Sequence, residues 1–311
     1  PFAGFRVQIP TLAHIFIIIG VIMLSVLSIG GNAIDERMRN LSYALSAVKE
    51  LYKIGDLIIT HGNGPQVGEL AEVEHLSLSL LTAQTEAEIG YAIKREIKNS
   101  LGLESEVFLT DVLVRKKDPA FKNPTKPIGK YYTKEEAEKL EEKGLKFAEF
   151  EKGFRRVVPS PRPIKILNIE SMKRSIKGKV LIAGGGGGIP LIKEGRKIEF
   201  VEAVIDKDYT TALIAKELGA KQMIILTNVD GAYINYGKPG EEMISEASTS
   251  EMRKYLKKGQ FGDGSMKPKV EACIDFVEKS KGIAAIGNLS KARDVARFRN
   301  CTVIKNTMQS S

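Results

Sequence analysis

Cysteine is scarce in this chain of 311 residues, and its two cysteines stand far apart. Cys273 and Cys301 form no CxxC pair and have no metal-binding Cys/His spacing, which excludes zinc fingers, iron–sulfur clusters and a disulfide framework. Such cysteine usage suits a reducing compartment, so we expect a cytoplasmic protein. Cys273 falls at an apolar position of a helical pattern, and we expect it in the core.

The common nucleotide-binding motifs are also missing. No G-x-x-x-x-G-K-[ST] loop occurs, and the glycines at positions 62, 64 and 68 miss the G-x-G-x-x-G spacing by one residue. The HRD and DFG motifs of protein kinases are absent. The sequence therefore belongs to neither the P-loop proteins, the Rossmann dinucleotide enzymes nor the protein kinases.

Long basic runs are lacking too, although Lys and Arg total 47 against 38 acidic residues, a net charge of +9. The basic clusters, such as residues 115–117, are short, and no RNP, helix-turn-helix or C2H2 pattern accompanies them. We therefore expect an anionic small molecule rather than nucleic acid as the partner. Hydrophobic residues at 43% and charged residues at 27% are typical of a globular chain with one large or two medium domains.

The N-terminal stretch has no charged residue between Arg6 and Asp35, and residues 12–29 are nearly all apolar. By hydropathy alone this is a marginal membrane-spanning helix, which would make the chain an anchored membrane protein. A signal peptide fits less well, because only Arg6 supplies the basic region. The other interpretation is a buried parallel strand that ends near Ile29 and follows unrelated sequence.

Beyond this stretch the strand and helix patterns alternate. Strands are expected at residues 57–60, 107–114, 179–183 and 222–226, and helices at residues 37–52, 89–101 and 208–218. This alternation predicts an α/β fold, with a mainly parallel sheet covered by helices on both faces. Residues 118–163, rich in Pro, Lys and Glu, interrupt the pattern; we expect a lid or binding element there, with a helix within 134–146.

Three loops that contain glycine follow apolar strands, at Gly30–Asn32, Gly62–Gly64 and Gly184–Gly188. Ligands of α/β sheets bind beyond the carboxyl ends of the strands, where backbone N–H groups hold anionic oxygens. Glycines can also serve only to close tight turns, but five in succession are costly to order without a ligand. The loops thus predict a phosphate-rich ligand. We expect the lone His61 to be a hydrogen-bonding loop residue rather than a metal ligand or an acid–base group.

Six strings of the sequence occur together in the order of one enzyme family. They are GGNAI (30–34), THGNGPQVG (60–68), DPAFKNPTKPIG (118–129), RVVPSP (156–161), VEAVIDKD (201–208) and GSM followed by PK (264–269). From about Met23 to its C-terminus the chain thereby resembles the carbamate kinases of the amino-acid kinase superfamily. NPTKPIG and VEAVIDKD are far more specific than any lone glycine motif.

The resemblance implies a homodimer of an open, mainly parallel, eight-stranded α/β/α sandwich with a protruding subdomain at about residues 115–163. Residues 23–198 would form an N-lobe for carbamate or carbamoyl phosphate, and residues 199–311 a C-lobe for ATP or ADP. The implied reaction interconverts ATP plus carbamate with ADP plus carbamoyl phosphate, and Mg²⁺ would accompany the nucleotide. Because the first strand would run to Ile29, no membrane helix could occupy it, and we predict that residues 1–22 lie outside the fold.

The resemblance also assigns the site residues. Lys207 and Lys269 would contact the phosphates, with Asp208 fixing both ammonium groups, and Lys126 would reach over the carbamoyl site. Such lysines suit phosphoryl transfer, which needs positioning and positive charge, and carbamate is already an anion that needs no general base. The carbamoyl end would contact Gly30, Gly31, Asn32, Gly62 and Asn63, and the nucleotide would contact Gly185, Gly186, Thr227, Val229, Asp230, Tyr236 and Met266.

Other interpretations remain. Lys207 and Lys269 could be solvated lysines, and Asp208 could be only a helix N-cap. An acetylglutamate-type kinase would carry a lysine where this chain has Ser28-Ile29 and would lack NPTKPIG. A nonenzymatic nucleotide-binding regulator would have lost a catalytic lysine or Asp208. Thr110-Asp111 and Lys267 depart from the family pattern, so the local geometry there is open.

Overall fold

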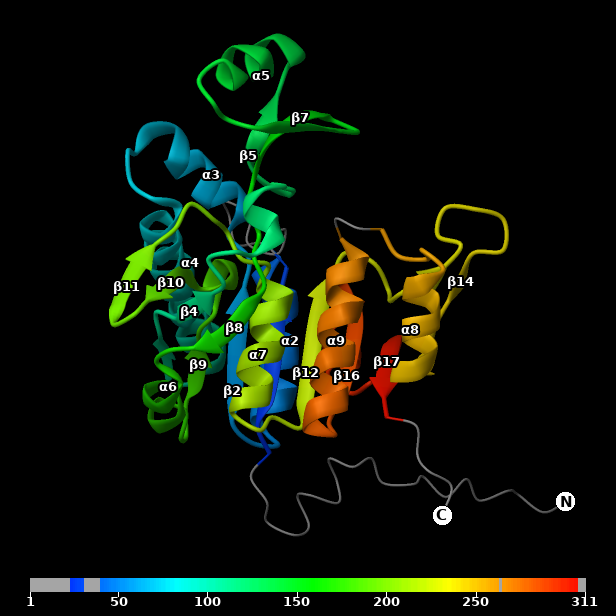
Figure 1. The fold of residues 1–311 in the computed structure, drawn as a ribbon. Helices are drawn as coiled ribbons and strands as arrows, with labels where there is room; N and C mark the ends of the chain where they lie inside the picture. The colour runs from blue at the N-terminus through cyan, green and yellow to red at the C-terminus, as the bar shows by residue number, and fades with distance from the viewer. Residues whose placement is uncertain (1–22, 31–39, 263–264, 307–311) are drawn as a thin grey trace, which may run out of the picture.

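The computed structural model describes residues 23–30, 40–262 and 265–306. Its centre is a sheet of eight strands in the order β15-β17-β16-β12-β1-β2-β9-β3 (Figure 1). The strands in that order are Glu246–Ser248, Cys301–Lys305, Ile283–Asn288, Gln222–Thr227, Ser25–Ile29, Leu57–His61, Val180–Ile182 and Ser105–Val107. All neighbours pair in parallel except β16 and β17, which pair antiparallel. The expected mainly parallel, eight-stranded sheet is confirmed.

Strand β1 lies in the middle of this sheet, and its sequence, SVLSI, has no charged residue and no regular alternation of polar and apolar residues. All five of its residues are buried, as expected for a strand covered on both faces. It pairs in register with β2 on one side and with β12 on the other, so that Ile29 lies level with His61 and Leu226. The chain therefore leaves these three strands at the same edge of the sheet.

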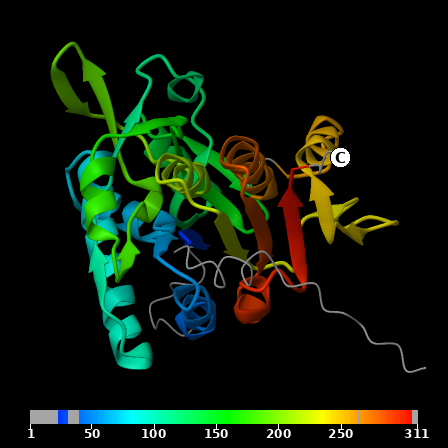
Figure 2. The same cartoon turned by 90° about the horizontal axis from the view of Figure 1, so that it is seen from below.

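Helices cover the sheet on both faces (Figure 2). One face packs against α2 (Leu41–Tyr52), α4 (Leu78–Leu101) and α10 (Ala292–Val295), and the other against α6 (Ile169–Ser175), α7 (Lys207–Glu217), α8 (Thr249–Lys257) and α9 (Met266–Ser280). Each face buries its own cluster of apolar side chains, which gives the expected three-layer architecture.

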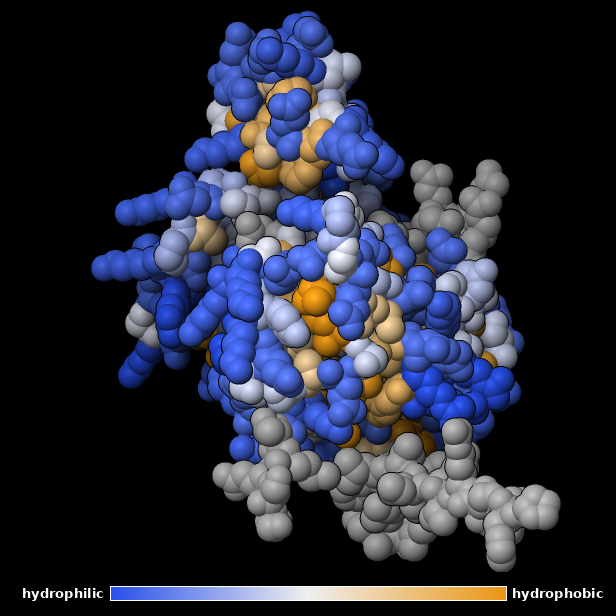
Figure 3. Space-filling model, turned by 90° about the vertical axis from the view of Figure 1, so that its right-hand side faces the viewer, coloured by the Kyte–Doolittle hydropathy of each residue, from blue (hydrophilic) through white to orange (hydrophobic). Residues whose placement is uncertain are grey.

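Three small sheets surround the main one. A four-stranded sheet has the order β11 (Lys197–Phe200), β10 (Ile189–Glu194), β4 (Asp111–Val114) and β8 (Pro163–Ile166), and β13 (Tyr233–Ile234) pairs with β14 (Glu242–Met243). The third sheet, β5 (Lys126–Tyr132), β7 (Gly153–Val158) and β6 (Phe147–Phe150), projects above the body together with α5 (Lys134–Glu141) (Figure 1). Within the range of about 115–163 expected for it, we call residues 126–158, which form this sheet and helix, the protruding subdomain. Figure 3 shows it standing clear of a largely hydrophilic face.

Several sequence-based boundaries were wrong. Residues 107–114 are two strands, β3 and β4, in different sheets. The turn between them exists because Thr110 faces inward, where its hydroxyl accepts a hydrogen bond from the N–H of Gly184 at 2.7 Å. Helix α4 begins at Leu78 rather than Ile89, since the Ser77 side chain caps it by accepting from Leu80 N. Helix α5, Lys134–Glu141, by contrast lies within the range 134–146 in which a helix was expected.

The predictions for residues 1–22, Gly31 and Asn32 concern positions outside the described residues. Within the part that the structure describes, no helix is both long and apolar enough to cross a membrane. Both expected lobes contribute strands to the one central sheet, since β1 of the first pairs with β12 of the second. The division at residue 198 stays a prediction.

The base of the protruding subdomain is fixed by a contact between two glycines. Helix α3 (Gly64–Val73) packs on β5, and a Cβ atom at Gly68 would lie 1.9 Å from the backbone nitrogen of Gly129.

We therefore expect Gly68→Ala to lower the free energy of unfolding by about 1–3 kcal/mol, the usual cost of overpacking. Glu69→Ala, an exposed neighbour on the same helix, should change it little. Urea unfolding of both variants tests this, and equal stabilities would contradict the proposed contact.

Candidate active site

The site lies where the carboxyl ends of the parallel strands meet loops that contain glycine. Gly30 follows β1, Gly62 follows β2, and the loop Gly184–Gly188 comes shortly after β9. Strand β12 reaches the same edge at Thr227. This is the edge at which open α/β sheets bind ligands, in the crevice beyond the carboxyl ends of the strands.

Asp208 is the centre of the charge arrangement at this edge. Its Oδ1 lies 2.6 Å from Nζ of Lys207, and its Oδ2 lies 2.9 Å from Nζ of Lys269. The side chain of Asp208 is only 2% exposed, so both ion pairs are shielded from water. Nζ of Lys207 also donates to the hydroxyl of Ser28 at 2.9 Å. One carboxylate thus fixes two ammonium groups from two different helices.

The first turn of α7 is arranged by its cap. The N-cap is Asp206, whose side chain accepts a hydrogen bond from the N–H of Asp208 at 3.0 Å. Asp208 is therefore inside the helix and not its cap, and it is free to face Lys269 in the first turn of α9. The alternative interpretation of Asp208 as a cap is wrong, because Asp206 takes that role.

The electrostatics keep this cluster charged. Burial opposes the ionisation of Asp208, but the ammonium groups of Lys207 and Lys269 outweigh it and hold the pKa of Asp208 below its ordinary value. Burial also works against the charge of Lys269, and the carboxylate of Asp208 raises the pKa of that lysine in spite of it. For Lys207 burial prevails and lowers the pKa, with the nearby ammonium of Lys269 acting in the same direction.

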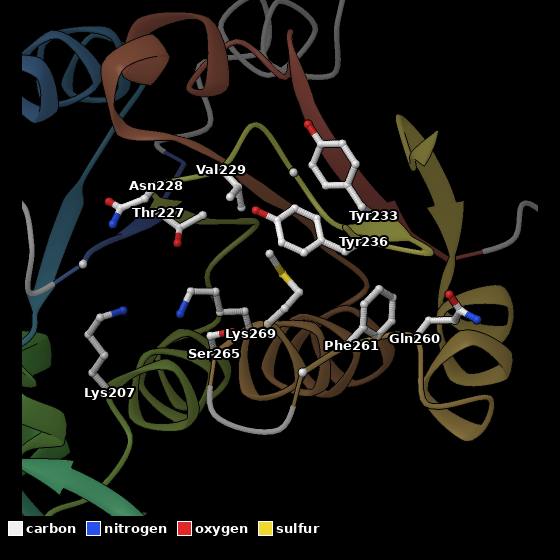
Figure 4. Close-up of a pocket in the computed structure, with 14 residues that line it drawn as sticks. Lys207, Thr227, Asn228, Val229, Tyr233, Tyr236, Gln260, Phe261, Ser265 and Lys269 are labelled. Carbon is white, nitrogen blue, oxygen red and sulfur yellow. The ribbon is translucent and has the colours of Figure 1, made fainter. Parts of the chain in front are cut away.

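Two pockets meet at the lysines. The larger, of about 430 Å³, is lined by Gly30, Lys207, Thr227, Asn228, Val229, Gly231, Tyr233, Tyr236, Gln260, Phe261, Gly262, Ser265, Met266 and Lys269. Figure 4 shows Lys207 and Lys269 on one side of it and the rings of Tyr233, Tyr236 and Phe261 on the other. The larger pocket thus has a cationic end and an aromatic end, which matches the two ends of a nucleotide in chemical character.

The smaller pocket, of about 280 Å³, lies beneath the protruding subdomain. It is lined by Gly62, Asn63, Gly64, Pro65, Lys126, Pro127, Arg155, Gly186, Val204, Ile205, Asp206, Lys207, Asp208, Ser265 and Lys269. Lys126, the first residue of β5, reaches Asp206, and the distance from its Nζ to Oδ2 is 2.5 Å. Lys207 and Lys269 line both pockets, so their ammonium groups lie at the boundary between the two.

Most of the expected site residues therefore lie around one of these pockets. Thr227, Val229, Tyr236 and Met266 line the larger one, and Gly62, Asn63 and Lys126 line the smaller one. Gly30 was expected at the carbamoyl end, but it lines the larger pocket.

Three residues expected at the nucleotide are placed elsewhere. Asp230 lines neither pocket, because its carboxylate pairs with Nζ of Lys291 at 2.8 Å and accepts from Asn288 at 3.0 Å. Gly186 lines the smaller pocket, and Gly185 is turned away, with its N–H donated to Glu86. The glycine-rich loop thus belongs to the side of the site that faces the protruding subdomain.

Glu86 of α4 holds this glycine-rich loop through a hydrogen bond, and the sequence analysis did not identify it as a site residue. Its two carboxyl oxygens accept from the N–H of Gly185 at 2.9 Å and from the N–H of Thr110 at 3.1 Å. Gly184, Gly187 and Gly188 also have bonded N–H groups, whereas Gly186 has no acceptor among the residues that the structure describes. The N–H of Gly186 is thus available to an anion in the smaller pocket.

His61 lies beside this loop and is fully buried at the end of β2. Burial lowers its pKa to about 4, so the ring is neutral near pH 7. Its Nδ1 lies 3.1 Å from the carbonyl oxygen of Gly62, and its Nε2 is buried without a hydrogen-bond partner in the described part of the chain. The ring fills space against Gly185, where a Cβ would come within 2.4 Å of it.

The two departures from the family pattern lie outside both pockets. Thr110 holds the glycine-rich loop, while Asp111 begins β4 and donates its N–H to Asn168 at 3.2 Å. Lys267 is half-buried in the first turn of α9 and lines neither pocket. Cys273 is buried in the core, as expected, and burial raises the pKa of its thiol.

Comparison with known proteins agrees with this geometry. The sequence model of the amino acid kinase family matches residues 23–288. "Carbamate kinase 2" of Staphylococcus epidermidis is 44% identical over 305 residues, which cover 90% of this chain and 99% of that protein. The chain belongs to the amino acid kinase family, and within it to the carbamate kinases. The carbamate kinase of Clostridium perfringens is 41% identical over 91% of this chain and 99% of its own length.

The fold is also similar to solved structures of carbamate kinases. The carbamate kinase of Giardia lamblia bound to AMP-PNP is 35% identical, covers 92% of this chain and 99% of its own, and superposes with a TM-score of 0.79. The family assignment thus rests on the sequence and on the arrangement of the strands together.

Glu86 should make the stability depend on pH. Burial raises its pKa to about 8 in the folded protein, from an ordinary value of 4.5, so folding favours the protonated carboxyl. Wild type should lose stability relative to Glu86→Gln as the pH rises from about 4.5 through 8, while His61 stays neutral. Urea unfolding of both proteins between pH 5 and 9 measures the difference. A difference that does not change with pH would show that the carboxyl is ionised throughout.

Proposed function

We propose that this chain catalyses reversible phosphoryl transfer between ATP and carbamate, giving ADP and carbamoyl phosphate. The observation that carries the proposal is the pair of pockets joined at Lys207 and Lys269, whose ammonium groups Asp208 holds in place. The larger pocket would take the nucleotide and the smaller one the carbamoyl group. The similarity to carbamate kinases supports carbamate over acetylglutamate as the acceptor.

In this arrangement the γ-phosphoryl group would lie at the boundary of the pockets, between the two lysines. An oxygen of carbamate forms the new bond to phosphorus while the bond to the leaving oxygen of ADP breaks, and the electron pair of that bond stays on ADP. Carbamate is an anion already, so no proton has to be removed. The N–H of Gly186 and the side chain of Lys126 would contact the acceptor side.

The lysines would lower the barrier through their charge. A single charge about 4 Å from a developing charge is worth about 4 kcal/mol at an effective dielectric constant of 20, roughly a thousandfold in rate if it acts only in the transition state. Asp208 reduces this gain by its own charge, but without it the two ammonium groups would repel each other and the buried Lys207 would lose its proton more readily. The cluster therefore keeps a net positive charge that stays in place.

Mg²⁺ is part of the proposal as a companion of the nucleotide. The described residues contain no group of three or more His, Cys, Asp or Glu side chains able to hold a metal ion. The carboxylates of Asp206 and Asp208 are both occupied by lysines. Mg²⁺ would therefore arrive on the phosphates of ATP or ADP.

We further propose that the chain works as a cytoplasmic homodimer. Both described cysteines are free and buried, as suits a reducing compartment. Helix α4 contacts both α3 and β11, and exposed apolar side chains on these three elements, among them Val73, Tyr91 and Phe200, would offer a surface for a second copy.

A coupled assay tests the reaction directly. Purified protein is given ADP, Mg²⁺ and carbamoyl phosphate, and ATP is measured with hexokinase and glucose-6-phosphate dehydrogenase. We expect ATP to form at a rate proportional to the protein concentration. No ATP above the control without protein would reject the proposed reaction and favour a regulator that only binds nucleotide.

Removing either lysine should reduce turnover. We expect Lys207→Ala and Lys269→Ala each to lower kcat at least a hundredfold, because each variant loses charge stabilisation of the transition state. Lys279→Ala, near the other end of α9, is the matched control and should keep full activity. A rise confined to KM, with kcat unchanged, would contradict these roles.

Lys126 should matter more for the acceptor than for the nucleotide. We expect Lys126→Met to raise KM for carbamoyl phosphate at least tenfold and to leave KM for ADP within twofold, because Lys126 lines only the smaller pocket. Lys130→Met removes an exposed lysine from the same strand and serves as the control. An equal rise in KM for carbamoyl phosphate and for ADP would contradict the proposed role of Lys126 at the acceptor.

A further inference from the structure

Arg155 is the cation of the smaller pocket that the sequence analysis did not select. It lies on β7 of the protruding subdomain, opposite Ala148 of β6, and faces the irregular part of β5 between Ile128 and Tyr132. Its side chain is half-buried and lines the pocket together with Asn63 and Lys126. The protruding subdomain thus contributes two cations to the pocket, one from β5 and one from β7.

The cationic side chains around the smaller pocket differ in whether a carboxylate pairs with them. Lys126 pairs with Asp206, and Lys207 and Lys269 share Asp208. Arg155 has no carboxylate within ion-pair distance among the residues that the structure describes. Its contacts are neutral: NH2 donates to the carbonyl oxygen of Gly129 at 2.6 Å, and Cζ lies 5.4 Å from the centre of the Tyr131 ring.

This environment leaves the guanidinium group short of partners. Its Nε atom is buried and has no hydrogen-bond acceptor in the described structure. Burial lowers the pKa of Arg155, which reflects the cost of removing the charge from water, although arginine stays protonated near pH 7. A half-buried cation without a counter-charge is costly, and an anion in the adjoining pocket would offset that cost.

The shape of the group favours one kind of anion. A guanidinium group is planar and offers parallel N–H donors at the spacing of the two oxygens of a carboxylate. The two lysines at the boundary between the pockets are placed for the phosphoryl group. The acceptor, a small planar carboxylate, would then lie deeper in the smaller pocket, on the side that the protruding subdomain covers.

We propose that Arg155 binds the acceptor, donating hydrogen bonds to the carboxylate oxygens of carbamate and to the carbamoyl oxygen of carbamoyl phosphate. The proposal rests on the function proposed above. Arg155 is thereby a substrate-binding residue and also a link, because the same side chain is bonded to Gly129 at the base of the protruding subdomain.

The neighbouring arginine provides a matched control. Arg156 follows Arg155 on β7 and therefore points to the opposite side of the strand. It is half-buried as well, lies near Glu202 and Glu72, and lines neither pocket. A loss that is due only to disturbance of the protruding subdomain should appear in both arginine variants, whereas a loss of acceptor binding should appear in one.

Calorimetry without turnover tests the proposal. Wild type, Arg155→Met, Arg155→Lys and Arg156→Met are titrated with carbamoyl phosphate in the absence of nucleotide, and separately with AMP-PNP and Mg²⁺. We expect Arg155→Met to bind carbamoyl phosphate at least tenfold more weakly and AMP-PNP within twofold of wild type. Arg155→Lys, which keeps the charge without the planar group, should fall in between, and Arg156→Met should behave like wild type.

Three outcomes would overturn the proposal. They are unchanged carbamoyl phosphate binding in Arg155→Met, equal losses of both ligands in that variant, and the same loss in Arg156→Met. If Arg155→Met fails to fold by circular dichroism, the folded Arg155→Lys protein decides, since it must still bind carbamoyl phosphate at least threefold more weakly than wild type. A wild type that binds carbamoyl phosphate but forms no ATP would reject the proposed reaction and leave the comparison of the arginine variants valid.

Discussion

The arrangement of the whole site depends on one buried carboxylate. Asp208 holds the ammonium groups of Lys207 and Lys269 at opposite oxygens, and neither lysine could keep a fixed position in a buried site without it. The first turns of α7 and α9 therefore have to lie side by side, and these two helices pack against each other. The packing of two helices is in this way tied to the distance between two charges.

A second layer of contacts serves this arrangement. Asp206 caps α7, and at the same time its carboxylate pairs with Lys126, so the start of the helix is joined to the protruding subdomain. Glu86 and Thr110 fix the glycine-rich loop beneath the smaller pocket. The residues of the site that carry charge are thus positioned by backbone N–H groups and by each other, rather than by loops that move independently.

Part of this could be read from the sequence. The apolar strands, the helices between them and the loops that contain glycine follow from local patterns, and the VEAVIDKD string pointed to Lys207 and Asp208. The split of residues 107–114 could not be read, because an apolar strand looks the same whichever sheet it joins. Glu86 looked like an ordinary polar residue of a helix, and only its distant partners bury it. The lack of a carboxylate within ion-pair distance of Arg155, among the residues that the structure describes, is likewise a property of the assembled fold.

The spacing of the site along the chain has a consequence for its synthesis on the ribosome. Ser28 meets Asp208 across 180 positions, Lys126 meets Asp206 across 80, and Lys269 meets Asp208 across 61. A nascent chain from which α9 has not yet emerged lacks one of the two ammonium groups. Its central sheet also lacks β16 and β17, the strands that lie between β12 and β15. The residues from Met266 onward therefore have to emerge before the two ammonium groups can be held by Asp208.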